Sequence, residues 1–270
     1  MSTGELNHLA EIDFDTFKRK VKLTYNLDLD AYKRPQMERR LRANMERCGA
    51  QTFQQYYSMM QTDNTLRDEF LDRVTINVSE LFRNPDQFET LRTKILPELI
   101  KGAQSGLSVW SAGCSYGAEP YSLAVLLDEA APGVHHNIHA TDIDDKMLAR
   151  AQNGVFQTQE MRNVSSPRLV KYFEPVSGGY MASNVLKKMI TFRKHNMLND
   201  AFRTGYDLIL CRNVVIYFTD ETKSALYQRF FKSLRPGGCL FVGGTERIAD
   251  SNEIGYENQI PFFYRKPYRH

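Results

Sequence analysis

Two carboxylates, each following a short apolar run, are the residues of this sequence whose placement points to chemistry. Glu119 follows Gly117 in the stretch VWSAGCSYGAEPYSL (109–123), where an apolar run leads into a loop of small residues and then a helical pattern. Asp142 ends a later apolar run, in HATDID (139–144). Glycines let a backbone approach a ligand closely, and a helix N-terminus offers free N–H groups. The acid beside this loop disfavours a phosphate.

The loop also lacks the motifs of two common nucleotide sites. No GK[ST] follows it, which excludes a P-loop, and the three-glycine fingerprint GxGxxG of dinucleotide-binding proteins is absent. An acid at the end of the second strand of such a fold accepts hydrogen bonds from ribose hydroxyls. S-adenosylmethionine combines a ribose with a positive charge and has no phosphate. Taken singly, Glu119 is also explained by the helix dipole and Asp142 as a strand-end cap, but their order and spacing favour a cofactor site.

A third polar position follows the apolar run YDLILC (206–211), where Arg212 and Asn213 would lie at the carboxyl edge of another strand. Methyltransferases that act on amino groups of nucleic acids commonly carry [ND]PP[FY] here, and this chain has no proline after Asn213. That argues against methylation of a base nitrogen. The histidines and cysteines show neither a catalytic triad nor the spacing of a metal site, so no metal is expected.

The elements that must position these residues change character along the chain. The first hundred residues or so read as successive helices, and Asn84–Pro85 predicts a helix start with Asn84 as the N-cap. From Leu107 onward, short apolar runs alternate with helical stretches, which is typical of a doubly wound α/β fold with a mainly parallel sheet. The last run, NQIPFFYRK (258–266), predicts one antiparallel edge strand.

We therefore expect an α/β, Rossmann-like domain preceded by a small all-helical domain. The predicted boundaries are residues 1–84 for the helical domain, 85–106 for a connecting helix and 107–270 for the α/β domain. A stretch rich in proline and glycine, about 165–190, fits neither pattern and predicts a small inserted β-subdomain.

Composition sets limits on the class of protein. The chain has 270 residues, of which 42% are hydrophobic and 25% charged, with a formal net charge of +3. That charge is too small to indicate nucleic-acid binding by itself. The four cysteines are widely spaced, so neither a disulfide framework nor a zinc site is expected, and a reducing cytoplasm fits. The acidic, polar start argues against a secretory signal, and no apolar run is long enough for a membrane helix.

Five motifs in order give the sequence a close resemblance to one family, the CheR-type chemotaxis receptor methyltransferases. They are RVTINVSELFRNPDQFETL (73–91), WSAGCSYGAEPYSLA (110–124), ATDID (140–144), CRNVVIYF (211–218) and LRPGGCLFVGGTE (234–246). The resemblance implies transfer of a methyl group from S-adenosylmethionine to glutamate side chains of bacterial chemoreceptors. The products would be glutamyl 5-O-methyl esters and S-adenosylhomocysteine, made by a cytoplasmic enzyme recruited to membrane chemoreceptor clusters for adaptation.

The same resemblance implies roles for individual residues. Arg83 is expected to pair with the cofactor carboxylate, Asp142 to bind the ribose and Tyr217 to stand near the transferable methyl group as the catalytic residue. The implied cofactor-binding set is Asn77, Ser79, Arg83, Glu119, Asp142, Asn196, Met197, Arg212 and Asn213.

The sequence departs from the family pattern in two places. Gly113, Tyr116 and Ala118 replace the usual alanine, threonine and first glutamate of the loop, and Tyr116 is expected to reshape it. The inserted segment EPVSGGYMASNVLKKM (174–189) has glycines but none of the arginines with which some members grip a receptor's C-terminal pentapeptide. We therefore expect no strong pentapeptide binding.

The predicted helix 35–48 carries many arginines. Met37, Leu41, Met45 and Cys48 share one face, while the arginines spread over the opposite half. A solvated basic face is the ordinary interpretation. The resemblance implies instead that this face docks on the acidic methylation helices of receptors. The arginines concerned are Arg39, Arg40, Arg42 and Arg47.

Three other functions compete with this interpretation. A nicotinamide-dependent oxidoreductase on the same fold is opposed by Glu119 and the missing fingerprint. An RNA methyltransferase is opposed by the modest net charge. A non-catalytic S-adenosylmethionine-binding regulator remains compatible with the altered glycine loop. A glutamate substrate, with a reference pKa of about 4.3, is ionised at neutral pH and needs no general base, which fits the lack of a catalytic histidine constellation.

Overall fold

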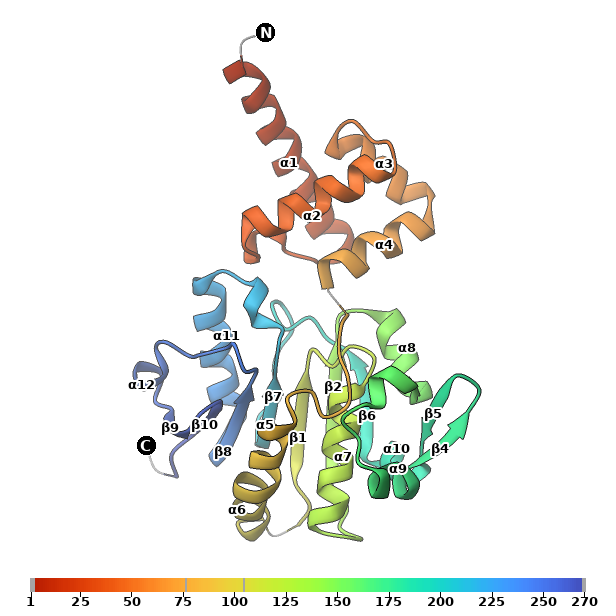
Figure 1. Cartoon of the computed structure of the whole chain (residues 1–270). Helices are drawn as coiled ribbons and strands as arrows, with labels where there is room; N and C mark the ends of the chain where they lie inside the picture. The colour runs from red at the N-terminus through yellow and green to blue at the C-terminus, as the bar shows by residue number, and fades with distance from the viewer. Residues whose placement is uncertain (1–2, 76, 104, 269–270) are drawn as a thin grey trace. The chain divides into compact units, whose positions relative to one another are not determined.

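The computed structural model describes residues 3–75, 77–103 and 105–268 and divides the chain into two compact units (Figure 1). One is a helical unit made of residues 3–75 and the returning segment Tyr217–Thr222. The other is an α/β unit made of residues 77–216 and 223–268. The two units are described separately below.

The helical unit packs its helices around a cluster of aromatic rings. Its helices are α1 (Thr3–Tyr25), α2 (Arg34–Arg47), α3 (Phe53–Thr62) and α4 (Asn64–Thr75), with a 3-10 turn at Leu29–Ala31. Pro35 lies in the first turn of α2, and Gly49 follows the helix with a φ of 77°. The buried rings at the centre are Phe14, Phe17, Phe53, Tyr56 and Phe70. The returning segment packs the Phe218 ring edge-on against Tyr32.

The α/β unit is built on a seven-stranded sheet with the order β6-β2-β1-β7-β8-β10-β9. The strands β6 (Ile190–Lys194), β2 (Asn137–Asp142), β1 (Ser108–Ala112), β7 (Tyr206–Cys211) and β8 (Leu234–Val242) run parallel. The strands β10 (Phe263–Arg265) and β9 (Glu257–Ile260) are antiparallel. This confirms the predicted doubly wound, mainly parallel sheet with an antiparallel edge.

The C-terminal run forms two edge strands rather than the single one predicted. A turn at Pro261 and Phe262 divides it. Pro261 has no backbone N–H, and Phe262 takes the left-handed conformation with a φ of 72°, so the chain reverses there and β10 pairs back on β9.

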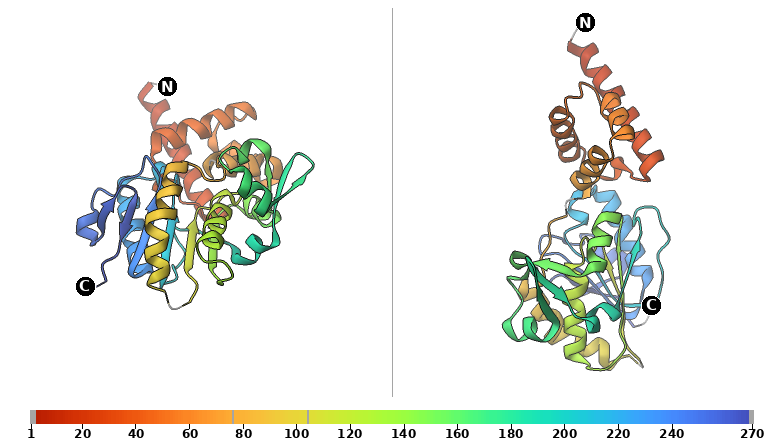
Figure 2. Two further views of the ribbon diagram at one scale, coloured as in Figure 1. Left: turned by 60° about the horizontal axis from the view of Figure 1, so that its bottom comes forward. Right: turned by 90° about the vertical axis from the view of Figure 1, so that its right-hand side faces the viewer.

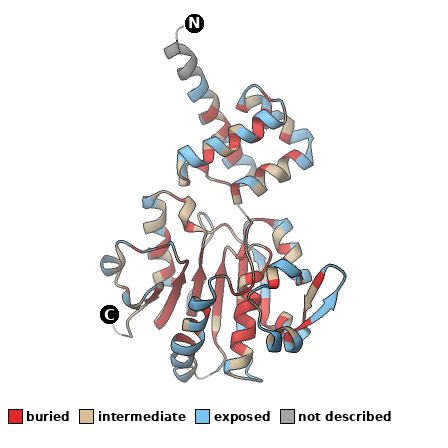
Figure 3. Ribbon diagram, viewed as in Figure 1, coloured by how far each residue is buried: buried red, intermediate tan, exposed pale blue. Residues whose placement is uncertain are grey.

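Helices cover both faces of the sheet (Figure 2). On one face lie α5 (Pro85–Thr90), α6 (Leu96–Lys101) and α7 (Ala118–Ala130), which share a core cluster with the inward side chain of Val109. On the other lies α11 (Asp220–Ser233), where Phe230 packs against the Trp110 ring. The opposite directions of Val109 and Trp110 follow from strand alternation. Figure 3 shows the central strands and α7 as largely buried.

The run 85–101 that joins the two predicted domains is one helical stretch packed into the α/β core. Phe88, Leu91 and Leu99 belong to the same buried cluster as the sheet. Leu91–Ile95 is a π-helical turn, in which the Leu96 N–H donates to the Leu91 carbonyl. Pro97 follows directly and has no N–H of its own, which accounts for the irregularity.

The remaining segment between β2 and β6 begins with α8 (Asp145–Asn153) and adds a three-stranded antiparallel sheet with the order β3-β5-β4. It contains β3 (Val155–Gln157), α9 (Ser166–Tyr172), β4 (Phe173–Val176), β5 (Gly179–Ala182) and α10 (Asn184–Met189). Gly178, with a φ of 81°, turns β4 into β5. A Cβ on Gly179 would lie 2.0 Å from the Phe156 carbonyl oxygen, so β3 and β5 can pair here only around a glycine.

Candidate functional site

The parallel strands end at one edge of the sheet, and segments that carry predicted site residues follow or end four of the five. A loop (113–117) follows β1, Asp142 ends β2, and Asn196 lies two residues after β6. Arg212 and Asn213 follow β7, and Gly243 follows β8. In an open α/β sheet, ligands bind in the crevice at this edge.

The loop after β1 is held in a conformation that favours glycine. Gly113 and Gly117 have φ values of 77° and 93°, and Ser115 has 47°. A Cβ built on Gly113 would lie 2.6 Å from Val214 Cγ2 and 3.5 Å from Met197 Cε. The loops that follow β6 and β7 therefore close on this glycine.

Asp142 anchors the loop and retains capacity to bind a ligand. Its side chain is buried, and its two oxygens accept hydrogen bonds from the backbone N–H groups of Ser115 (2.7 Å) and Asp144 (3.0 Å). Burial raises the pKa of this carboxyl above its ordinary value. Each carboxylate oxygen has a second lone pair, so the side chain can also accept hydrogen bonds from ribose hydroxyls.

Glu119 lies in the first turn of α7 and faces the end of β1. It accepts a hydrogen bond from the Ser111 hydroxyl at 2.7 Å, and Arg212 Nη1 lies 3.5 Å from its other oxygen. Burial raises the pKa of Glu119, and the neighbouring guanidinium only partly opposes that shift. The acid is therefore paired with a buried guanidinium, and a purely helix-dipole role does not account for its contacts.

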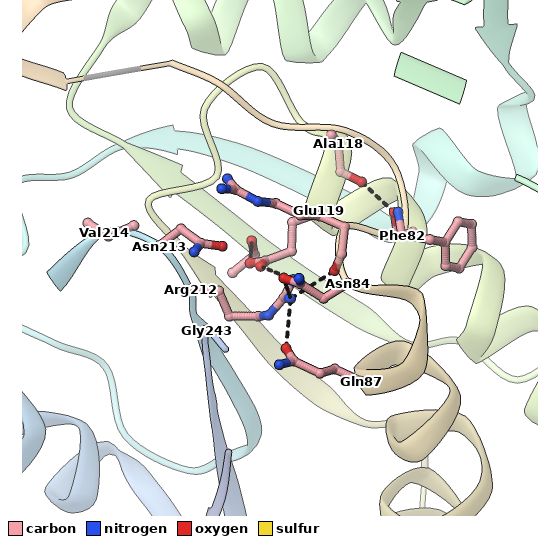
Figure 4. Close-up of polar contacts among 12 residues, drawn as sticks. Phe82, Asn84, Gln87, Ala118, Glu119, Arg212, Asn213, Val214 and Gly243 are labelled. Carbon is pink, nitrogen blue, oxygen red and sulfur yellow. Dashed lines mark hydrogen bonds and ion pairs between the residues drawn. The ribbon is translucent and has the colours of Figure 1, made fainter. Parts of the chain in front are cut away.

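Arg212 holds the segment that precedes α5 (Figure 4). Its Nη2 donates to the Arg83 carbonyl (2.8 Å), the Asn84 side-chain oxygen (3.1 Å) and the Gln87 side-chain oxygen (3.0 Å). The guanidinium also lies over the Phe88 and Phe241 rings. Its side chain is only 2% exposed, so Arg212 joins the segment at Asn84 to the interior of the sheet.

Asn84 is the N-cap residue of α5, as predicted, but its side chain does not make the capping hydrogen bond. The residue has a φ of 61°, and its side-chain oxygen instead accepts from Arg212. A buried guanidinium that needs acceptors has taken the side chain that the helix end would otherwise use.

Asn77, Ser79 and Arg83 lie along the segment that enters the α/β unit. Asn77 donates to Asp144 (3.0 Å) and accepts from the Ser115 hydroxyl (2.9 Å), so it contacts the loops after β1 and β2. The Ser79 carbonyl accepts from the Tyr116 hydroxyl. Arg83 Nη1 donates to the Val78 carbonyl at 2.9 Å. The segment and the glycine loop thus form one hydrogen-bonded assembly.

Asn196 and Met197 belong to a compact turn after β6. The Asn196 side-chain oxygen accepts from the Leu198 N–H (3.0 Å), and Asp200 accepts from the Asn196 N–H (2.8 Å). Arg229 of α11 donates to the carbonyls of Met197, Leu198 and Asp200. Arg229 was not predicted from the sequence, because a helical arginine gives no sign of which carbonyls it will reach.

Glu246 is a second residue that sequence reasoning missed, although it lies in the motif LRPGGCLFVGGTE. Its buried carboxylate accepts from the backbone N–H groups of Asn213 (2.9 Å), Val214 (3.1 Å) and Gly243 (2.5 Å). Asn213 has a φ of 60°, so the acid stabilises a left-handed turn at a predicted cofactor residue. The signal available in the sequence was an acid two residues after the glycine pair that follows a strand.

Tyr217 and the predicted docking arginines lie in the helical unit. The Tyr217 ring lies under the Arg40 guanidinium, 5.1 Å from ring centroid to Cζ, and its carbonyl accepts from the Lys33 N–H at 2.9 Å. Arg42 pairs with Glu38 at 2.6 Å and Arg47 with Glu69 at 2.5 Å. Arg39 is exposed. Met37, Leu41 and Met45 are buried, while Cys48 of the predicted apolar face is only half-buried.

The chemistry of the site is that of binding and orientation. Burial raises the pKa of the Cys114 and Cys211 thiols well above the ordinary value, so neither is a thiolate nucleophile. Among residues 3–75, 77–103 and 105–268, no group of three or more His, Cys, Asp or Glu side chains is placed to hold a metal ion. Within the same ranges, no helix is long and apolar enough to cross a membrane.

Comparison with known proteins identifies the family. The family described as "CheR methyltransferase, SAM binding domain" matches residues 77–261, and "CheR methyltransferase, all-alpha domain" matches residues 12–75. A "Chemotaxis protein methyltransferase" of Listeria monocytogenes is 40% identical over 256 residues, which cover 95% of this chain and 98% of the relative.

Two further similar proteins carry the same description. "Chemotaxis protein methyltransferase 1" of Pseudomonas aeruginosa is 36% identical over 88% of this chain and 91% of the relative. The "Chemotaxis protein methyltransferase" of Borreliella burgdorferi is 31% identical over 97% and 98%. With both domains matched and a carboxylate donor set that suits a ribose and a cation, the chain belongs to the CheR methyltransferase family and uses S-adenosylmethionine as its cofactor.

Proposed function

We propose that this methyltransferase methylates glutamate side chains of bacterial chemoreceptors during chemotactic adaptation. The products are glutamyl 5-O-methyl esters and S-adenosylhomocysteine. The similar proteins named above are described as chemotaxis protein methyltransferases. The observation that carries the proposal is the pair of acids at the sheet edge, where Asp142 is buried and Glu119 accepts a hydrogen bond from the Ser111 hydroxyl.

The proposed cofactor contacts follow the strand ends. Asp142 binds the ribose, while Asn196 and Met197 contact the adenine. Asn77, Ser79 and Arg83 hold the methionine end, with Arg83 as the partner of its carboxylate. Glu119, Arg212 and Asn213 complete the wall beside the methionine portion, and Glu119 supplies negative charge there.

The proposed chemistry requires orientation rather than proton transfer. When bound, S-adenosylmethionine supplies a methyl group on a sulfonium. A glutamate carboxylate is already ionised at neutral pH and attacks without a general base. Orientation and exclusion of water can lower such a barrier by about 7–11 kcal/mol at the upper end. Tyr217 is the proposed catalytic residue: it directs the carboxylate or faces the sulfonium, a contact worth about 0.5–2 kcal/mol.

We assign receptor docking to the helical unit. Its α2 arginines present charge to the acidic methylation helices of receptors, which steers association. Arg39 is the strongest candidate, because it is exposed, whereas Arg42 and Arg47 already pair with Glu38 and Glu69. Reversing Arg39 to glutamate should impair receptor methylation and leave cofactor affinity intact, whereas Arg40 is left in place because its guanidinium lies over the Tyr217 ring. Equal loss of both properties would contradict this assignment.

The inserted sheet is not assigned to pentapeptide recognition. The β4–β5 hairpin carries Gly178 and Gly179 but no arginine. A receptor-type C-terminal pentapeptide should therefore show no micromolar affinity by calorimetry. Cytoplasmic location and recruitment to receptor clusters are part of the same proposal, and no binding to DNA is expected.

The decisive experiment is transfer of radiolabelled methyl from S-adenosylmethionine to chemoreceptor-containing membranes, followed by treatment with base. Release of the label as methanol identifies carboxyl methyl esters and supports the proposal. Base-stable label points to another acceptor, such as nitrogen or RNA, and overturns it. Cofactor binding without transfer would favour the alternative of a non-catalytic regulator.

A further inference from the structure

Tyr116 closes a ring of contacts between the glycine loop and the entering segment. Its hydroxyl donates to the Ser79 carbonyl, and its ring lies under the Arg150 guanidinium, 4.0 Å from centroid to Cζ. Arg150 in turn donates to both carboxylate oxygens of Glu160, each at 2.7 Å. The Glu160 carbonyl accepts from the Leu81 N–H at 3.0 Å, two residues beyond Ser79. The contacts therefore return to the segment where they began.

The Tyr116 hydroxyl is well placed to act as a permanent donor. The residue is 3% exposed, and burial together with the nearby Glu160 carboxylate raises the pKa of the phenol above its ordinary value. It therefore stays protonated at neutral pH. A threonine, the residue expected here from the family pattern, carries its hydroxyl on Cβ and is too short to occupy the position of the tyrosine hydroxyl.

The segment that this ring holds depends on side-chain contacts for its order. Residues 77–83, all of which the structure describes, form neither helix nor strand. Phe82 lies within it at a φ of 52°, and Asn84 follows at 61°, both left-handed values that cost energy for residues other than glycine. A segment of this kind keeps one conformation only while its neighbours enforce it.

We infer that Tyr116 is a positioning residue for cofactor binding. Through Ser79, and with Arg150 and Glu160 behind it, Tyr116 fixes the segment 77–83 in its binding conformation before the cofactor arrives. This inference rests on the proposed function insofar as Asn77, Ser79 and Arg83 bind the methionine end. Tyr116 would then contact neither cofactor nor substrate, yet it would influence the affinity of the site for S-adenosylmethionine.

If Tyr116 preorganises the segment 77–83, then removing its hydrogen bond should weaken cofactor binding. A protein whose binding-competent conformation is only partly populated binds its ligand more weakly by that fraction. Removing one buried hydrogen bond shifts such an equilibrium by about fivefold, which corresponds to ~1 kcal/mol. Tyr116→Phe deletes only the hydroxyl. The dissociation constant for S-adenosylmethionine should therefore rise about fivefold, with a smaller change in kcat.

A matched control exists in the first turns of α7, five residues further along the chain. Tyr121 is also fully buried, and its hydroxyl donates to the Ala151 carbonyl of α8 at 3.2 Å, one residue after Arg150. Tyr121→Phe removes an equivalent hydrogen bond without touching the segment. Both variants should lose similar stability, but only Tyr116→Phe should lose affinity. Arg150→Met supplies a second test of the closed set of contacts, since it removes the contacts of Arg150 with Tyr116 and Glu160.

The experiment combines calorimetry of S-adenosylmethionine binding with hydrogen exchange of the peptide that spans residues 77–83, using the full-length chain. We expect weaker binding and faster exchange in Tyr116→Phe and in Arg150→Met, and neither in Tyr121→Phe. In the double variant Tyr116→Phe/Arg150→Met, the dissociation constant should rise by less than the product of the two single fold-changes. The reason is that both residues belong to the same closed set of contacts.

Wild-type affinity in Tyr116→Phe, with or without faster exchange, would overturn the inference. So would an equal loss of affinity in Tyr121→Phe. Neither result bears on the acceptor, because the assay contains the cofactor alone. A wild-type protein that binds S-adenosylmethionine but does not methylate receptors would refute the proposed function and leave this inference intact.

Discussion

Replacing Arg212 with methionine should destabilise the α/β unit strongly, and in a manner that depends on pH. The change removes three donated hydrogen bonds, to Arg83, Asn84 and Gln87, and leaves the Glu119 carboxylate without its cation. The side chains of Arg212 and Glu119 are only 2% and 12% exposed, respectively. Removing one partner of a buried pair typically costs about 3–5 kcal/mol. For a unit of this size that corresponds to a fall in Tm of roughly 10 °C.

The pH dependence follows from Glu119. Burial already raises its pKa in the folded protein, and loss of the opposing guanidinium raises the pKa further. A carboxyl whose folded pKa exceeds its unfolded value binds protons more tightly when folded, so stability falls as pH rises through the folded pKa. The loss of unfolding free energy in Arg212→Met, relative to the wild type, should therefore be smallest near pH 4, below the ordinary glutamate pKa of about 4.3. It should grow toward neutral pH.

The assay is urea unfolding followed by fluorescence at several pH values, with Arg168→Met as the matched control. Arg168 makes a similar two-pronged pair with Glu129, at 2.9 and 2.7 Å, but the two side chains are 21% and 28% exposed. The free energy of unfolding of Arg168→Met should be lower than that of the wild type by about 1 kcal/mol or less. Equal losses of unfolding free energy in the two variants, or a loss in Arg212→Met that is constant from pH 4 to pH 8, would show that the Glu119–Arg212 pair does not stabilise the unit. Adding Glu119→Gln should restore part of the loss.

Three other substitutions test the rest of the site. Glu246→Gln turns an amide N–H₂ toward backbone donors at Asn213 and Gly243, so initial methylation rates should show a loss of kcat of about tenfold; an unchanged kcat would separate this carboxylate from the reaction. Gly113→Ala places a Cβ 2.6 Å from Val214 at a φ of 77°, so calorimetry should show cofactor affinity reduced by about tenfold or more. Arg229→Gln frees the carbonyls of Met197, Leu198 and Asp200, which should weaken binding of S-adenosylhomocysteine about fivefold. A change in Tm without a change in affinity would limit the role of Arg229 to stability.

Much of the fold could be predicted from local patterns. Alternation of apolar runs with helical periodicity predicted the parallel strands and their covering helices, because each pattern reflects which faces a segment must bury. The edge hairpin was missed because one apolar run spans β9 and β10, and only Pro261 marks the turn between them. The inserted sheet was predicted from its glycines, but its third strand, Val155–Gln157, is too short to show a period.

The class of fold, the family and the cofactor could all be predicted from the amino-acid sequence. These depend on residue types at fixed positions relative to strand ends, and strand ends can be found from the chain alone. The side chains that hold the site residues in place became apparent only from the folded chain. Glu246 holding Asn213, Arg229 holding the turn after β6, and Tyr116 holding Ser79 are contacts between residues far apart in the chain. No local pattern encodes them, because which donor meets which acceptor depends on how the strands and loops come together in space.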